Sequence, residues 1–366
     1  MSLICSACGE EYSSNQPVWR CHCGGLLEVD FTPEFPIREI EARHPGLWRY
    51  REAIPVSVPV SFGEGFTPMV RETVGGVDVY LKLEYLFPSG SFKDRGASVM
   101  VSKIHELGIS QVVEDSSGNA GAAVAAYCAK SGIGCDIYVP ESTSPGKLTQ
   151  IGAYGARLHR VPGSREATSR AVLEAARATY YASHIYNPYF LEGTKTFAFE
   201  VAEQLGWRAP DCIVTPVGHG SMLLGSYIGF RELMEAGVTD NLPRIIGVQS
   251  ESCRPLSKAW EAGADDFVPV LKKPTVAEGI SIAEPVRAPQ ILNAVRETGG
   301  FIVSVSEDEI ISGLKEAVGK GYYIEPTSAT VLAALNTLDD LGTIVVPLTG
   351  IGLKATGKLG KLLGGV

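Results

Sequence analysis

The feature that most constrains the fold is an alternation of short apolar runs and helix-length segments that begins near residue 77. "VDVYLKLEYL" and "QVVEDS" have the length and composition of strands, and "SFKDRGASVMVSKIHELG" and "GNAGAAVAAYCAKSG" have those of helices. The alternation continues to "TIVVPLTG" near the C-terminus. Such a pattern predicts an α/β fold with largely parallel, buried sheets. The 366-residue chain has more of these units than one small sheet needs, so we expect two α/β domains.

The composition restricts the classes of function. A formal net charge of −9 and a pI near 5.3 disfavour binding to nucleic acid or to anionic membranes. No apolar run approaches the roughly 18 residues that a membrane helix needs. The start "MSLICSACGEE" has no basic region followed by an apolar one, so no secretory signal is expected. Eight cysteines without such a signal favour a reducing compartment, and we expect a cytoplasmic protein that acts on a small molecule.

The first 30 residues form a cysteine-rich segment with the spacing C-x-x-C and, further on, C-x-C. Four thiolates within so short a stretch are enough for a tetrahedral zinc site, and reduced cysteines without metal are the alternative. The candidate ligands are Cys5, Cys8, Cys21 and Cys23, with His22 as a possible substitute. The next stretch is rich in proline and is predicted to be a linker with irregular loops. The remaining cysteines lie in apolar contexts that are typical of core thiols.

Four junctions between predicted strands and helices are rich in Gly, Ser or Thr: "SGSFKDRG", "DSSGNAG", "PVGHGSMLLG" and "PLTGIGLK". Ligands of α/β folds bind at the carboxyl ends of strands, and helix N-termini bind anions. Each junction alone is ordinary loop chemistry, and a single lysine such as Lys93 is usually a surface charge. The third loop is neither a P-loop nor G-x-G-x-x-G. The combination of the four is far more specific than any one of them.

The order and spacing of these motifs resemble the fold-type II pyridoxal-phosphate (PLP) enzymes, which include the tryptophan synthase β-like proteins, and most closely the threonine synthase family. The resemblance runs from about residue 63 to residue 354. It is carried by "GEGFTP", "SGSFKDRG", "SSGNAG", "NPYFLEGTKTFAFEVAEQLG", "PVGHG", "EPTSA" and "LTGIGLK". It implies two three-layer α/β domains with PLP at their interface, and a homodimer. The expected domains are a zinc-ribbon-like segment (1–30), a large PLP-binding domain (31–88 and 188–366) and a small domain (89–187).

The resemblance also implies roles for individual residues. Lys93 would form the Schiff base with the PLP aldehyde and then move protons, so its amine must be neutral and its pKa lowered by desolvation. Asn119 would contact the ring hydroxyl of PLP, and Thr349 its pyridine nitrogen. The substrate carboxylate would bind the loop of Ser116, Ser117, Gly118, Asn119 and Ala120. The cofactor phosphate would bind the loop of Gly218, His219, Gly220, Ser221 and Met222.

The chain departs from the family pattern where a second phosphate would bind. Threonine synthases convert O-phospho-L-homoserine to L-threonine and phosphate, and their motif usually reads Asn-Pro-x-Arg-Leu-Glu-Gly-Gln-Lys-Thr. Here Phe190 replaces the arginine, and Ala120 replaces a threonine, so donors to the substrate phosphate are lost. His184, His219, Lys195 and Arg165 are candidates to compensate.

Two other functions are therefore weighed beside threonine synthase. The first is a PLP-dependent β-elimination or β-replacement enzyme, such as a serine or threonine dehydratase or a synthase that uses O-activated serine. The "SSGNAG" motif resembles the dehydratases of the same fold. The second is a zinc-ribbon interaction protein without enzymatic activity. The acidic net charge and the presence of Lys93, Asn119 and Thr349 oppose that second function.

Overall fold

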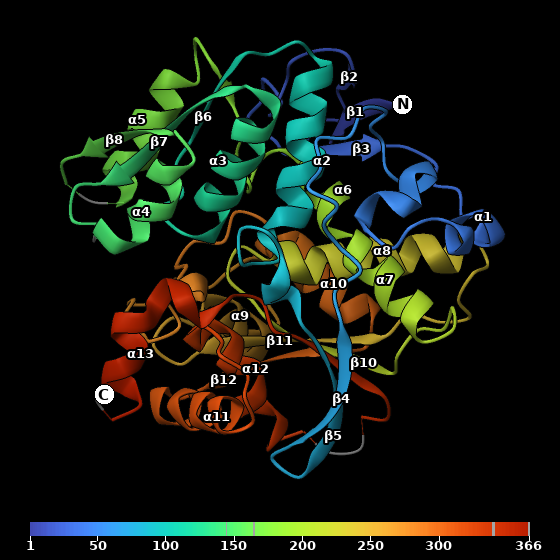
Figure 1. Cartoon of the computed structure of the whole chain (residues 1–366), viewed down its shortest axis with the longest axis vertical. Helices are drawn as coiled ribbons and strands as arrows, with labels where there is room; N and C mark the ends of the chain where they lie inside the picture. Colours follow the sequence, from blue (N-terminus) through green and yellow to red (C-terminus); the bar gives the residue numbers. More distant parts are fainter. Residues whose placement is uncertain (144, 164, 339–340, 365–366) are drawn as a thin grey trace. The chain divides into compact units, whose positions relative to one another are not determined.

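The computed structural model describes residues 1–143, 145–163, 165–338 and 341–364. Its contacts divide the chain into two compact units (Figure 1). Unit 1 comprises Met1–Phe66 and Lys93–Thr196, and unit 2 comprises Thr67–Phe92 and Phe197–Val366. The predicted boundaries near 88 and 188 lie a few residues from these divisions, whereas residues 31–66 group with unit 1. The assignment of these segments to functional domains stays a prediction.

Unit 1 contains a parallel sheet with the strand order β8-β7-β6-β9. Its strands are β6 (Gln111–Glu114), β7 (Gly134–Pro140), β8 (Arg157–Val161) and β9 (Tyr180–Tyr181). Its helices are α2 (Lys93–Glu106), α3 (Asn119–Ser131), α4 (Pro145–Ala153), α5 (Arg165–Ala175) and α6 (Pro188–Thr194). Helix α3 is rich in alanine, and this lets it pack closely against α2. Helix α2 also packs against α6.

The N-terminal part of unit 1 is an antiparallel sheet with the order β2-β1-β3. Its strands are β1 (Ser2–Cys5), β2 (Glu11–Ser13) and β3 (Leu27–Asp30). The proline-rich stretch that follows contains α1 (Ile37–Ala42) and the 3-10 helix η1 (Leu47–Ala53). The prediction of an irregular linker was wrong for this part, because buried side chains such as Leu47 and Tyr50 anchor it to the core.

Unit 2 contains a sheet with the order β12-β11-β10-β13-β5-β4, in which only the β4–β5 pair is antiparallel among the described strands. Its strands are β4 (Met69–Val74), β5 (Val77–Lys82), β10 (Cys212–Pro216), β11 (Arg244–Ser250), β12 (Phe301–Val305) and β13 (Ile344–Pro347). Gly75 and Gly76 both have positive φ, as the tight turn of the β4–β5 hairpin requires.

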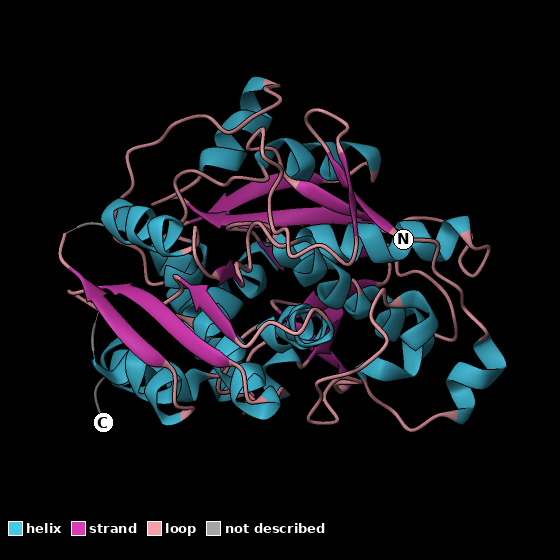
Figure 2. Cartoon of the chain, turned by 90° about the horizontal axis from the view of Figure 1, so that it is seen from above, coloured by secondary structure: helices cyan, strands magenta, loops and turns pink. Residues whose placement is uncertain are grey.

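The α-helices of unit 2 are α8 (Ser221–Glu235), α9 (Pro255–Ala262), α10 (Ala288–Glu297), α11 (Glu307–Gly319), α12 (Pro326–Leu335) and α13 (Thr356–Leu362). Helix α7 (Thr196–Gln204) begins at the division between the units. The 3-10 helices of unit 2 are η2 (Glu84–Leu86), η3 (Glu278–Ile280) and η4 (Gly352–Ala355). Figure 2 shows the strands as twisted layers with helices packed along them. The predicted α/β architecture with largely parallel sheets is thus confirmed.

The strand orders decide which loops are neighbours. In unit 2, β10 pairs with β13 in parallel, so the loops that follow these strands lie side by side. In unit 1, β6 pairs with β9 in parallel, and the segments that follow them are adjacent in the same way. Within the described part of the chain, no helix has both the length and the apolar character needed to cross a bilayer.

Candidate functional site

The loop between β10 and α8 in unit 2 is held tightly by its surroundings. Gly220 precedes the first turn of α8 with a φ of 82°, and a Cβ there would lie 2.3 Å from the Ile291 side chain. A Cβ on Gly218 would lie 3.0 Å from the backbone of Ile280 in η3. Glycine is therefore required at position 220, and a side chain at position 218 would crowd the backbone of η3. The backbone N–H groups of the first turn of α8 have no partner within the helix and are suited to bind an anion such as a phosphate.

Thr349 follows β13, the neighbour of β10. Its hydroxyl is 3.1 Å from the hydroxyl of Ser328 in α12, and the Ser328 oxygen also accepts the N–H of Gly350 at 3.1 Å. Both side chains are buried. This pair of hydroxyls offers a neutral hydrogen-bond partner to a ring nitrogen. Ser328 lies in the "EPTSA" motif, but the sequence alone did not link it to Thr349.

Residues 90–92, directly before Lys93, are joined to this region of unit 2 by backbone hydrogen bonds. The N–H of Phe92 donates to the carbonyl of Thr349 at 3.1 Å, and the N–H of Ile351 donates to the carbonyl of Gly90 at 3.0 Å. The hydroxyl of Ser91 is buried and makes no hydrogen bond within the described residues. A buried hydroxyl of this kind is costly unless a bound polar group satisfies it, so Ser91 fits a cofactor-binding site.

Lys93 is the first residue of α2 in unit 1 and is half-buried. Burial lowers its pKa to about 8, and the carboxylate of Glu114 acts in the opposite direction. The expectation that desolvation lowers this pKa agrees with the structure. The Nζ atom lies 5.7 Å from the centre of the Phe190 ring. A lysine of this kind is neutral in a substantial fraction of molecules near pH 8, as nucleophilic or basic chemistry requires.

The loop between β6 and α3 in unit 1 holds the residues assigned to the substrate carboxylate. The Ser116 hydroxyl accepts the N–H of Gly118 at 3.2 Å, and Asn119 is the first residue of α3. A Cβ on Gly121 would lie 1.9 Å from the carbonyl oxygen of Ser116, so glycine is needed there. Ser116, Ser117, Gly118 and Asn119 are all at least partly exposed, whereas Ala120 is buried. The open loop at a helix N-terminus can receive a carboxylate.

Sequence reasoning missed the buried carboxylate at the end of β6. Glu114 is fully buried, and its Oε1 is 2.7 Å from Nδ1 of His184. Its Oε2 accepts the N–H of Asp115 at 2.6 Å. The ring of His184 packs edge-on against Phe190, with 6.0 Å between the ring centres. A glutamate directly after two buried valines at the end of a strand was the available signal, but nothing in the sequence indicated its partner.

The structure therefore groups the predicted residues in two sets. Lys93 and the loop of Ser116, Ser117, Gly118, Asn119 and Ala120 belong to unit 1. Gly218, His219, Gly220, Ser221, Met222 and Thr349 belong to unit 2. Lys195 is buried, pairs with Glu192 and lies near the ring of Phe31, so it is engaged in the core. The side chain of Arg165 lies outside the described residues.

The four N-terminal cysteines converge in unit 1. Their Sγ atoms all lie within 4.8 Å of one another, with 3.6 Å between Cys5 and Cys23 and between Cys8 and Cys21. These separations are far longer than a disulfide bond and close to the roughly 3.8 Å between thiolates in a tetrahedral zinc site. The Nδ1 atom of His22 is 2.7 Å from the Tyr12 hydroxyl, so His22 already has a partner outside the cluster.

The ionisation of the cluster also favours a cation. A backbone hydrogen bond at Glu10 lowers the pKa of Cys8, but the neighbouring thiols Cys23, Cys21 and Cys5 together raise it to about 12. Several thiolates so close together need a positive charge to coexist. A Cβ on Gly25 would lie 2.5 Å from the Cys5 sulfur, so glycine lets the sulfurs approach. The residues present fit a zinc ion.

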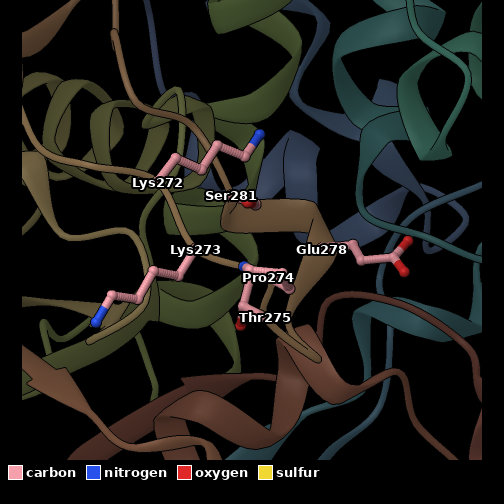
Figure 3. Close-up of a pocket in the computed structure, with 6 residues that line it drawn as sticks. All are labelled: Lys272, Lys273, Pro274, Thr275, Glu278 and Ser281. Atoms are coloured by element: carbon pink, nitrogen blue, oxygen red, sulfur yellow. The ribbon is translucent and has the colours of Figure 1, made fainter.

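A cavity of about 430 Å³ in unit 2 is lined by Lys272, Lys273, Pro274, Thr275, Glu278 and Ser281. The two lysine side chains point in different directions, and the carboxylate of Glu278 points away from both (Figure 3). The two amines therefore do not converge on a common ligand. Glu278 in the wall of the cavity belongs to η3, whose Ile280 backbone lies beside Gly218 in the loop before α8.

Comparison with known proteins agrees with these features. The sequence profile of the family described as "Pyridoxal-phosphate dependent enzyme" matches residues 60–350. A protein of Methanocaldococcus jannaschii named threonine synthase is 37% identical, over 96% of this chain and 92% of that protein. A threonine synthase of Methanosarcina acetivorans is 38% identical, over 93% of this chain and 88% of that protein.

Among solved structures, maize serine racemase matches with a TM-score of 0.70 and 21% identity. The match covers 80% of this chain and 92% of the racemase. At that identity the likeness establishes the fold. A match over 80% of this chain is long enough to include parts of both α/β units.

Proposed function

This chain belongs to the family of pyridoxal-phosphate-dependent enzymes, and we propose that it is a lyase of the threonine synthase type, which converts O-phospho-L-homoserine to L-threonine and phosphate. The relatives with that name match nearly the whole chain. The single observation that carries the proposal is Lys93. It stands in the "SGSFKDRG" motif at the start of α2, and burial lowers its pKa to about 8.

The residues of this chain would hold the cofactor from several sides. The neutral amine of Lys93 would bond to the aldehyde carbon of PLP. The N–H groups of the loop before α8 would bind the phosphate of PLP, and the Thr349 hydroxyl would contact its ring nitrogen. Asn119 would contact the ring hydroxyl. When bound, PLP supplies an electron sink for the negative charge that develops at the substrate Cα.

Different residues of the chain would bind the substrate and transfer its protons. The loop of residues 116–120 would bind the α-carboxylate through backbone N–H groups and so orient the Cα–H bond toward Lys93. The Lys93 amine would take the proton from Cα and return protons at later carbons. Because the Thr349 hydroxyl is neutral, it does not enforce a protonated ring nitrogen, and this favours elimination and replacement over transamination.

One observation favours a second candidate, a PLP-dependent β-elimination or β-replacement enzyme that acts on a smaller amino acid. The Phe190 ring is fully buried, lies 5.7 Å from the Lys93 Nζ and packs against Gly96. It stands where the family pattern has an arginine, and a phenyl ring donates no hydrogen bond to a substrate phosphate. A site without those donors would favour a substrate that carries no second phosphate.

Trapping of the cofactor tests the enzyme assignment. Borohydride reduction of the PLP-loaded chain should link PLP to Lys93, and Lys93→Ala should abolish the link and the activity. Lys103→Ala, on the same helix, is the matched control and should retain the link. Recovery of the reduced cofactor on another lysine would contradict the assignment.

Product analysis separates the two candidates. The loaded chain should release threonine and phosphate from O-phosphohomoserine if it is a threonine synthase. Ammonia and a keto acid from serine or threonine, or turnover of O-activated serine alone, would favour the second candidate instead.

We further propose that Cys5, Cys8, Cys21 and Cys23 bind one structural zinc ion per chain. The fit of the sulfur separations to tetrahedral geometry supports this proposal. Protein produced with zinc available should contain about one equivalent, and Cys8→Ser should lose it while PLP binding persists. Cys253→Ser, at a buried core thiol, is the control and should keep the metal. The homodimer rests on the resemblance and the cytoplasmic location on the cysteine usage, and both stay predictions.

A further inference from the structure

The cysteine-rich segment is joined to the rest of unit 1 through Trp19, which stands two residues before the candidate ligand Cys21. The indole of Trp19 packs edge-on against the ring of Tyr181, with 5.1 Å between the ring centres, and against the ring of Tyr186 at 5.8 Å. The guanidinium of Arg20 lies 4.8 Å from the centre of the Tyr186 ring. Two consecutive residues of the segment therefore rest on two aromatic rings.

Arg20 is also tied to the turn that carries two of the candidate metal ligands, Cys21 and Cys23. Its Nε donates to the carbonyl of Gly24 at 2.6 Å, and the N–H of Gly24 donates to the carbonyl of Cys21 at 2.9 Å. A metal held by the two cysteines would fix this turn, and with it the backbone from which Arg20 and Trp19 project.

Tyr181 connects the segment to the sheet of unit 1. It is the last residue of β9, is buried, and pairs with Val113 of β6. It shares a small apolar cluster with Val113 and Val172, and Trp19 packs against that cluster. The hydroxyl of Tyr181 donates to Oδ1 of Asp115 at 2.7 Å. The ring of Tyr181 thus contacts the cysteine-rich segment, and its hydroxyl holds the first residue of the loop that follows β6.

Asp115 fixes the start of that loop. Its side chain is buried, and its carboxylate accepts from Tyr181 and, at the longer distance of 3.4 Å, from the hydroxyl of Ser169 in α5. Its backbone N–H donates to Oε2 of Glu114 at 2.6 Å. A buried carboxylate is stable only where hydrogen bonds satisfy it, so these donors determine where Asp115 lies. Its position in turn determines where residues 116–118 begin.

We propose that Trp19 and Tyr181 are positioning residues that join the cysteine-rich segment to the substrate loop. The folded cysteine turn holds Trp19, which supports the ring of Tyr181, and the Tyr181 hydroxyl holds Asp115. Both residues act through Asp115 and not by contact with the substrate. This inference rests on the proposed function, because the loop is the one assigned to the substrate α-carboxylate. It gives the cysteine-rich segment a role in substrate affinity without placing a metal in the chemistry.

Hydrogen exchange in the cofactor-free, full-length chain tests the contact directly, whatever reaction the chain catalyses. The N–H groups of Asp115 and Gly118 are hydrogen-bonded within the loop, so their exchange reports its order. Tyr181→Phe keeps the ring and removes the donor, and it should speed exchange in this loop about tenfold. Trp19→Leu should have a similar effect, and Trp19→Phe, which keeps an aromatic contact, a smaller one.

Two matched variants control for a general loosening of the protein. Tyr180→Phe removes the neighbouring buried hydroxyl, whose partner is the side-chain amide of Asn187 at 2.8 Å. Trp260→Leu removes a half-buried indole from α9 in unit 2. Neither should change exchange in the loop after β6. Unchanged exchange in Tyr181→Phe, or an equal rise in the loop before α8, would overturn the proposal.

Loss of the metal tests the first link of the chain of contacts. In protein that contains zinc, Cys8→Ser should speed exchange in the same loop, and adding Trp19→Leu should increase it little further, because both changes break one path. An unchanged loop or a fully additive double variant would overturn the proposal. Protein without zinc would refute the zinc site alone, because the Trp19 and Tyr181 variants still decide by exchange.

Kinetics of the loaded enzyme give a second readout. The loop binds the α-carboxylate and Lys93 moves the proton, so Tyr181→Phe should raise the KM for the substrate about three- to tenfold, with kcat changed less than about twofold. A fall in kcat at constant KM would contradict a role in substrate positioning. Absence of turnover with every amino acid tested would refute the proposed function, and faster exchange in the Tyr181 and Trp19 variants would still support the positioning of the loop.

Discussion

Two loops in this protein have the same local design and different surroundings. Each follows a parallel strand and opens a helix: residues 115–118 lie between β6 and α3, and residues 217–220 lie between β10 and α8. The loop of unit 1 is partly exposed at residues 116–118, and it begins at the buried Asp115, directly after the buried Glu114. The loop of unit 2 is largely buried and packs against the apolar side chain of Ile291 and the backbone of η3.

The difference shows how one structural unit can be adapted to two tasks. A loop held by glycines against apolar neighbours keeps its N–H groups in one arrangement, which suits a permanent anion such as a cofactor phosphate. A loop with serines, open space and nearby ionisable groups suits a ligand that must enter, react and leave. If this interpretation is right, changes of protonation should act through the loop of unit 1, and an added methyl should be tolerated at Gly118 in that loop but not at Gly220 in the loop of unit 2.

The largest expected effect is on the pH dependence of cofactor capture. The pKa of Lys93 is lowered to about 8, so half of the amine is neutral at that pH and about 1% at pH 6. The rate at which the cofactor-free chain captures PLP should therefore rise about fiftyfold from pH 6 to pH 8 and level off above it. Stopped-flow absorbance measures this rate. A rate that continues to rise tenfold per unit through pH 10 would mean that the lysine is unperturbed.

A second prediction compares equivalent glycines in the two loops. Gly220→Ala forces alanine into a φ of 82° and brings a methyl group within 2.3 Å of Ile291, so PLP affinity should fall at least about tenfold and stability by about 1–3 kcal/mol. Gly118→Ala is the counterpart in unit 1. Its φ is −114°, and the nearest atom to the added methyl is 3.9 Å away.

Equilibrium dialysis of PLP and thermal unfolding of both variants check this second prediction. Gly118→Ala should cost at most about 1 kcal/mol, because nothing crowds the added methyl and the loss is only that of replacing a glycine N-cap by alanine. Equal losses in both variants would remove the distinction between a rigid loop and an open one.

The smallest effect is expected at Ser328. Ser328→Ala removes the hydroxyl that accepts the N–H of Gly350 and contacts Thr349, and it should destabilise the chain by about 1–2 kcal/mol. It should also weaken PLP binding a few-fold, because Thr349 loses its orienting partner. Ser226→Ala in α8, where the hydroxyl bonds to the carbonyl of Met222, is the control. Chemical denaturation with and without PLP distinguishes them, and indistinguishable PLP affinities would show that Thr349 does not need Ser328.

Several features of the fold and of the candidate site could be predicted from local sequence patterns. The strand–helix alternation predicted α/β units, because buried parallel strands are apolar runs and their connections are helices. The C-x-x-C spacing predicted a cluster of thiols, and the four cysteine sulfurs do converge. Glycine at 220 stands where the backbone conformation and the packing exclude a side chain, and glycine at 218 stands where a side chain would be crowded. These features depend on residues close together in sequence, so they leave a visible pattern there.

Contacts between distant residues left no such pattern. Glu114 and His184 are 70 residues apart, and they meet because β6 and β9 pair in parallel and end at the same edge of the sheet. Thr349 and Ser328 meet because the first turn of α12, which contains Ser328, lies beside the loop that follows β13. Phe190 lies against Lys93 because glycine at position 96 leaves room for its ring on α2. Strand order and helix packing are collective outcomes of burying the whole core, so the charge that surrounds the lysine was decided only when the chain folded.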